Sequence, residues 1–154
     1  MFAHFGIRSK ILDEQRHSIF VIHRHRTGRT HYDLRILFPD GNLRSWSLLK
    51  EPPLRDGEKR LAIERESFPP QAVGARTIEE QAFGHGRVFI WDEGMVEIQI
   101  TAPEIVTIVF RGKKIAGVYE LRRMVKRYPG NHWLLIRQSC GQPRQSCGQP
   151  RQSC

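Results

Sequence analysis

The sequence predicts an all-β fold, mainly antiparallel, in the form of a small closed or nearly closed β-barrel with little helix. Two observations carry this prediction. From Ser18 onward, short apolar runs are regularly interrupted by turn-forming residues, and several runs alternate apolar and polar side chains as half-buried strands do. The chain also has 154 residues, which is long enough for one domain with a real core. Many short strands around one core are typical of a barrel.

The chain divides into three segments: an N-terminal extension, residues 1–17, a β-barrel domain, residues 18–136, and a tail, residues 137–154. Residues 7–16 of the extension are compatible with a short helix. The tail repeats Arg-Gln-Ser-Cys-Gly-Gln-Pro, and the Gly and Pro of each seven-residue unit exclude a heptad helix, so we expect it to be disordered. All three cysteines lie in this tail, so the domain does not depend on disulfides.

The first two expected strands form a hairpin. Residues 18–22 are typical of a strand, which ends with two histidines on one face, and a second strand runs over residues 31–38. Residues 26–30 between them include a glycine and have the length of a hairpin loop. In the second strand the period of two separates an apolar face from a polar face, the latter formed by His31, Asp33 and Arg35.

The remaining strands are shorter and are separated by turn signals. We expect turns at residues 39–42, 92–94 and 111–114, where Pro, Gly, Asp and Asn are concentrated. Residues 67–81 are irregular and are the best candidate for a long functional loop. The expected strands cover residues 43–49, 60–65, 87–91, 96–100, 105–110, 115–121 and 132–136.

The hairpin predicts a metal site. Its register sets His25 nearly opposite His31 and points both the same way as Asp33, and cross-strand neighbours lie about 5 Å apart at Cβ. Two imidazoles and a carboxylate can then converge on one divalent ion, a donor set that suits manganese, zinc or non-haem iron. Arg35, one residue pair further along, can hold a phosphate or carboxylate with two hydrogen bonds. The alternative is a solvated basic hairpin whose His and Asp form surface pairs.

The charge of the chain indicates the kind of partner. The formal net charge is +9, which favours a polyanion, with nucleic acid before a membrane surface. The first ten residues lack the continuous apolar region of a signal peptide, and no apolar run approaches transmembrane length. We therefore expect a cytoplasmic protein that does not bind a membrane.

Seven blocks of the sequence, in this order and spacing, resemble the 3′-phosphoesterase domain of bacterial DNA ligase D. The resemblance extends over residues 18–136, and the chain is then expected to be a stand-alone, monomeric version of that domain. The blocks are residues 20–25, 31–35, 45–50, 59–62, 84–94, 110–117 and 133–136.

The resemblance implies a small β-barrel that binds manganese, with Zn²⁺ or Co²⁺ as alternatives. It also implies an enzyme that removes a 3′-terminal ribonucleotide or a 3′-phosphate from the end of a DNA primer–template, in support of end joining and DNA repair. Its partners would be a DNA ligase or a Ku-type protein. Its expected location would be the nucleoid, in the cytoplasm of a prokaryote. The matching positions are His25, His31 and Asp33 as catalytic metal ligands, Arg35 at the scissile phosphate, and Lys50 and Arg60 lining the same pocket.

The chain departs from the family's usual residues at three positions. His23 stands where the family usually has glutamine, and Ala72 where it has tyrosine. Phe68 replaces a histidine that contacts phosphate, which a phenylalanine cannot do, so reduced activity is part of the expectation. His23 and His85, the latter between two glycines, are candidates to replace the lost phosphate contacts.

Two alternative functions stay open at this point. One is a DNA-end-binding module with weak or absent catalysis that assists a ligase or a Ku-type partner. The other is a non-haem iron oxygenase, because two histidines and one carboxylate also build that kind of site. Against the oxygenase, the three ligands come from a single hairpin and the protein is basic.

Overall fold

The computed structural model describes residues 17–68, 87–126 and 130–139. The helix expected at residues 7–16, the positions of Ala72 and His85, most of the loop expected at 67–81 and the repeats from Cys140 onward lie outside the described residues. The described residues contain eight strands and no helix. The strands are β1 (His17–Thr27), β2 (Arg29–Leu37), β3 (Leu43–Leu48), β4 (Lys59–Phe68), β5 (Arg87–Ala102), β6 (Ile105–Arg111), β7 (Ala116–Arg123) and β8 (His132–Arg137).

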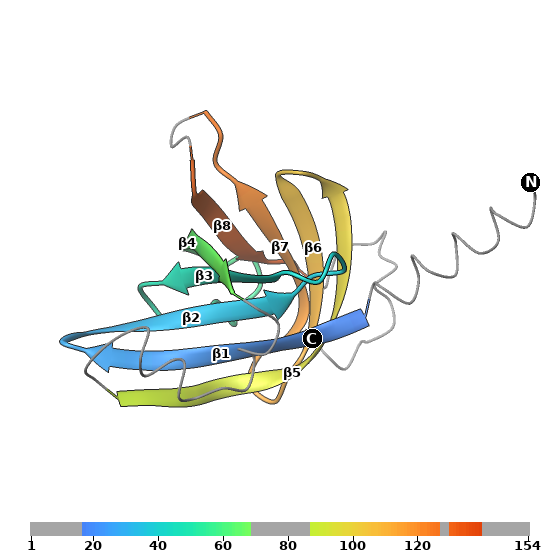
Figure 1. The fold of residues 1–154 in the computed structure, drawn as a ribbon. Coiled ribbons are helices and arrows are strands. Elements are labelled where there is room, and N and C mark those ends of the chain that lie inside the picture. Colours follow the sequence, from blue (N-terminus) through green and yellow to red (C-terminus); the bar gives the residue numbers. More distant parts are fainter. Residues whose placement is uncertain (1–16, 69–86, 127–129, 140–154) are drawn as a thin grey trace, which may run out of the picture.

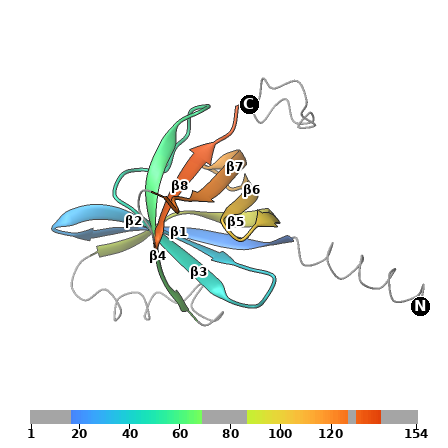
Figure 2. The same ribbon diagram turned by 90° about the horizontal axis from the view of Figure 1, so that it is seen from above.

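The strands close into one antiparallel barrel in the order β1-β2-β3-β4-β8-β7-β6-β5, which confirms the predicted fold class. The strands from β1 to β4 pair in sequence, and so do those from β5 to β8 (Figure 1). Pairing of β1 with β5 and of β4 with β8 joins the two meanders into a closed barrel. Figure 2 shows the same strands from above.

Alternate residues of each strand fill the barrel. Phe20, Ile22, Leu34, Ile36 and Trp46 belong to one continuous buried cluster that draws on all eight strands. Its aromatic rings pack edge to face, an arrangement that their charge distributions favour. The closest pairs are Phe20 with Phe110, at 4.9 Å between ring centroids, Phe110 with Tyr119 at 5.1 Å, and Trp46 with Trp133 at 5.9 Å.

The hairpin of β1 and β2 has a tighter turn than the sequence predicts. The strands continue to Thr27 and Arg29, and only Gly28 lies between them. Its φ is 83°, a backbone conformation that residues other than glycine rarely adopt. The prediction of a five-residue loop at 26–30 is therefore wrong. The hairpin extends beyond the neighbouring strands, with the start of β5 beside β1 (Figure 1).

The prediction of a turn at residues 92–94 is also wrong, because these residues continue β5. The pairing with β1 shifts register at Trp91, an extra residue that makes a β-bulge, so the strand bends without ending. The Asp92 carboxylate instead accepts hydrogen bonds from the backbone N–H groups of Lys113, Lys114 and Ile115 in the turn between β6 and β7. A Cβ at Gly94 would lie 2.5 Å from the backbone oxygen of Arg111, so this turn-like composition serves close packing.

The last strand reaches Arg137, one residue into the expected tail. The Arg137 side chain is buried, and its guanidinium donates to the Asp56 carboxylate, the Ala116 carbonyl and the Tyr119 hydroxyl. Arg137 therefore belongs to the barrel.

Candidate metal centre

The polar cluster lies on the outer face of the first hairpin, on the side opposite the barrel core. In the register of β1 and β2, His25 pairs with His31 and His23 pairs with Asp33. The residues that alternate with them lie on the other face of the hairpin, where Ile22 and Leu34 are fully buried in the core. One strand pair thus carries an apolar face and a polar face, as its period of two predicts.

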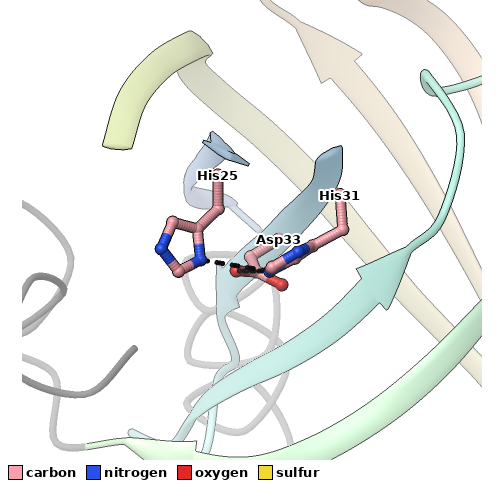
Figure 3. A group of neighbouring side chains, drawn as sticks. All are labelled: His25, His31 and Asp33. Carbon is pink, nitrogen blue, oxygen red and sulfur yellow. Dashed lines mark hydrogen bonds and ion pairs between the residues drawn. The ribbon is translucent and has the colours of Figure 1, made fainter. Parts of the chain in front are cut away.

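The side chains of His25, His31 and Asp33 point toward one another (Figure 3). The distance between Nδ1 of His25 and Nε2 of His31 is 3.2 Å, and that between Nε2 of His31 and Oδ2 of Asp33 is 3.3 Å. One ligand atom from each residue lies within 4.8 Å of the other two. His25 and Asp33 are each 1% exposed, so the cluster is shielded from water except at His31.

The neighbours of each group set its protonation. Burial lowers the pKa of His25, and the adjacent His31 lowers it further against the opposing effect of Asp33. The hydrogen bond to Asp33 raises the pKa of His31 against the effect of burial. Burial alone would raise the pKa of Asp33, but hydrogen bonds from His31 and Ser47, aided by the charge of Arg35, hold it below its ordinary value. Asp33 is therefore ionised and His25 neutral at pH 7, the forms that bind cations.

Ser47 and Arg65 belong to the cluster and were not identified from the sequence. The Ser47 hydroxyl donates to Oδ1 of Asp33 at 2.7 Å, and Nε of Arg65 donates to the Ser47 oxygen at 3.2 Å. Asp33 pairs with Ser47 across β2 and β3, and Arg65 lies on β4 opposite Ser45. The alternation of Leu43, Ser45 and Ser47 on one side of their strand was the only signal in the sequence, and it did not fix their partner.

Arg35 lies next to Asp33 on the same face of β2 and is 0% exposed. Burial lowers its pKa to about 10, with Asp33 acting in the opposite direction. The guanidinium therefore keeps its charge at neutral pH inside the protein. A buried cation here favours a negative charge nearby, and the Asp33 carboxylate provides part of that charge.

The other predicted site residues lie at different distances from the cluster. His23 is 1% exposed and pairs with Asp33, so the structure brings it to the cluster. Lys50 is exposed, beyond the end of β3. Arg60 is not brought to the cluster: it shares the face of β4 that carries core residue Ala62, and its guanidinium bonds to Glu58 and to backbone oxygens of Glu51 and Lys59. A substrate contact by Lys50 or Arg60 stays a prediction.

The donor set fits a divalent transition-metal ion. Two imidazole nitrogens and a carboxylate oxygen, close together on rigid paired strands, are ligands that manganese and zinc accept. The Ser47 hydroxyl donates a hydrogen bond to Asp33, and such a bond from a residue that is not itself a ligand orients a metal-binding carboxylate. Among the described residues, His25, His31 and Asp33 are the group that can hold such an ion.

A closed antiparallel barrel with this cluster on its first hairpin defines a small β-barrel protein with a candidate metal centre. The family model for the DNA ligase D 3′-phosphoesterase domain matches residues 23–123, more than half of the chain. The chain belongs to this family.

Curated relatives agree with this assignment. The chain is 30% identical over 132 residues to the multifunctional non-homologous end joining protein LigD of Pseudomonas aeruginosa, with 81% of the chain and 16% of that protein covered. It is 32% identical over 132 residues to the Mycolicibacterium smegmatis protein of the same name (78% and 17% covered) and 35% identical over 125 residues to that of Mycobacterium bovis (77% and 16%). The chain thus spans about one sixth of the length of these relatives. Within the described residues, no helix has the length and apolar character needed to cross a bilayer.

Proposed function

We propose that the protein is a manganese-dependent phosphoesterase that processes DNA 3′ ends, removing a 3′-ribonucleotide or a 3′-phosphate in support of end joining. The observation that carries this proposal is the His25–His31–Asp33 cluster in a chain of the DNA ligase D 3′-phosphoesterase family. The names of the relatives supply the context of non-homologous end joining.

The residues of the cluster would have separate roles in the reaction. A divalent ion held by His25, His31 and Asp33 would neutralise charge on the phosphate oxygens as the ester bond breaks. The hydrogen bond from Ser47 keeps the Asp33 carboxylate ionised and fixed in direction. Arg35 and Arg65, which both pair with Ser45 in the row next to Asp33, add positive charge there, and such charge stabilises a phosphoryl transition state.

A DNA-end-binding module is the second candidate function. It is favoured by Phe68, which stands where the resemblance implies a phosphate-binding histidine. Such a module would keep the cluster and the affinity for DNA ends without releasing phosphate or nucleoside. In either case the partners would be DNA 3′ ends and the proteins that join them.

The test is manganese-dependent processing of a labelled primer–template that ends in one 3′-ribonucleotide or in a 3′-phosphate. We expect shortening or dephosphorylation by the wild-type protein, and its loss in His31→Ala and in Asp33→Ala, because each removes a metal ligand. Titration calorimetry with Mn²⁺ should show the same two substitutions abolishing metal binding.

The matched control is His132→Ala, a histidine at the start of β8 outside the cluster, which should retain processing. Binding of the primer–template without processing would favour the end-binding module. Processing that survives both cluster substitutions would contradict the proposal.

A further inference from the structure

Positive charge is unevenly balanced over the described residues. Several arginines of the barrel form ion pairs with carboxylates, at 2.6–3.3 Å: Arg44 with Glu64, Arg60 with Glu58, Arg111 with Glu97, Arg122 with Glu120 and Arg137 with Asp56. The first hairpin differs, because between His17 and Leu37 the sequence contains one acidic residue, Asp33, which belongs to the metal centre. Arg24 and Arg26, on β1, form no ion pair with any residue that the structure describes.

These arginines lie on the face of the hairpin opposite the metal centre. Arg24 pairs with Tyr32 of β2 on one side and with Phe89 of β5 on the other, so the three side chains form a row across the strands. Arg26 is the next residue on the same face. We call Arg24, Arg26, Tyr32 and Phe89 the Arg24 face.

The Arg24 face combines exposed aromatic surface with unbalanced charge. Phe89 is 48% exposed, although a phenylalanine is normally buried. Arg26 is exposed, and Nε of Arg24 is buried without a hydrogen-bond partner among the described residues. Tyr32 is partly buried against the core, and its ring centroid lies 6.0 Å from that of the buried Trp91, over which Lys114 lies at 5.1 Å. The face thus places two arginines beside one exposed aromatic ring, that of Phe89.

We propose that the Arg24 face binds an unpaired DNA strand. Proteins that bind single strands combine cations that follow the phosphates with aromatic rings on which bases stack. This proposal rests on the proposed function for the choice of DNA as the polyanion. Because the metal centre and the Arg24 face occupy the two sides of one hairpin, the 3′ terminus lies on one side and the unpaired partner strand on the other. The hairpin then stands at the junction between paired and unpaired DNA.

The test is fluorescence anisotropy with a labelled oligothymidylate of about 16 nucleotides, the upper end of known site sizes for small single-strand-binding folds. Its 3′ terminus is blocked by an inverted nucleotide, so the metal centre has no end to engage. We expect Phe89→Ala to weaken binding about tenfold through the loss of base stacking. We expect Arg24→Gln and Arg26→Gln each to reduce the slope of log affinity against log salt by about 0.7.

Matched controls separate this face from general surface effects. Met95→Ala removes an apolar side chain of the same strand that is 51% exposed but pairs with Ile19 and Arg111 away from the hairpin tip. Lys126→Gln removes an exposed cation that follows β7. Both controls should bind the oligonucleotide as the wild type does, and all variants should unfold at the wild-type temperature.

The outcomes distinguish this proposal from the proposed function. Unchanged oligonucleotide binding in Phe89→Ala and Arg24→Gln overturns the DNA-binding face, even if the protein processes 3′ ends. Binding that depends on these residues, in a protein that processes no end, supports the face and contradicts the enzymatic proposal alone. If the substitutions abolish binding to phosphatidylserine vesicles and leave DNA binding intact, the face binds a lipid surface and the proposal is overturned.

Discussion

Asp33 is a carboxylate that the protein removes from water and still keeps ionised. It is 1% exposed, and a buried carboxylate without donors would take up a proton. The Ser47 hydroxyl and the His31 imidazole supply the donors, while Arg35 adds a positive charge on the same strand. The readiness of this group to bind a cation therefore depends on a serine from a different strand.

Substitution of Ser47 by alanine should weaken Mn²⁺ binding about 10- to 100-fold, the usual effect of removing an outer-shell partner. The barrel should stay folded, because the change removes one oxygen atom. Titration calorimetry measures the affinity. Ser45→Ala is the matched control, since Ser45 is buried on the same strand and face but pairs with Arg35. Equal loss of affinity in both variants would contradict a specific role for Ser47.

The sequence was sufficient for the part of the centre that lies within one hairpin. His25, His31 and Asp33 are close in the chain, so alternation and the Gly28 turn bring them together. Ser47 and Arg65 come from strands whose register depends on the loops between them, and alternation within one strand does not give that register. Arg60 illustrates the same difficulty, because its place on β4 puts it on the face of Ala62.

At the scale of elements, the turn between β6 and β7 is held by a side chain from β5. The Asp92 carboxylate accepts four hydrogen bonds from backbone N–H groups, at N–O distances of 2.7–3.1 Å. The donors are Glu93, Lys113, Lys114 and Ile115. Gly112 leaves room for this contact, because a Cβ there would lie 2.4 Å from the Asp92 carboxylate. The motifs around residues 92–94 and 111–115 are therefore two halves of one structural contact, which local turn propensity could not reveal.

Substitution of Asp92 by asparagine should reduce the free energy of unfolding by about 2 kcal/mol at neutral pH, since hydrogen bonds to a charged group are lost. Burial alone would raise the pKa of Asp92, but the four donors hold it below the ordinary value of 3.8. The stabilisation is therefore fully present above pH 3.8 and is lost as the pH falls through the lower pKa of the folded protein. Urea unfolding at a series of pH values checks this: the difference between the two proteins should shrink below pH 3.8. A difference independent of pH would contradict it.

At the scale of the whole molecule, closure of the barrel depends on the contact between β4 and β8. Trp133 of β8 packs edge to face on Trp46 of β3, and its indole N–H donates to Glu64 of β4 at 2.9 Å. Arg44 lies over both indole rings while its guanidinium donates to Glu64. Apolar packing and an ion pair thus join the two meanders at one end of the barrel.

Substitution of Trp133 by alanine should reduce the free energy of unfolding by about 3–5 kcal/mol, because it leaves a large cavity and removes the donor to Oε1 of Glu64. Unfolding should remain a single transition when followed by far-ultraviolet and near-ultraviolet circular dichroism, since a closed barrel has one core. Leu134→Ala, on the opposite face of β8 and only partly buried, should cost less. A separate early transition in the Trp133 variant would mean that the two meanders fold independently.

The bulge at Trp91 sets how this domain tolerates changes in length. It lets β5 align Arg87–Ile90 with the hairpin tip while the rest of the strand keeps its register with the barrel. Deletion of Trp91 would remove the extra residue and leave Asp92 opposite Ile22 and Ile90 opposite His23, so Phe89 would stay on the side of Arg24 and Val88 on the side of His25. A single-codon deletion at this point would thus keep the two faces of the strand in place, whereas a deletion within residues 88–90 would move the strand residues before it to the opposite face.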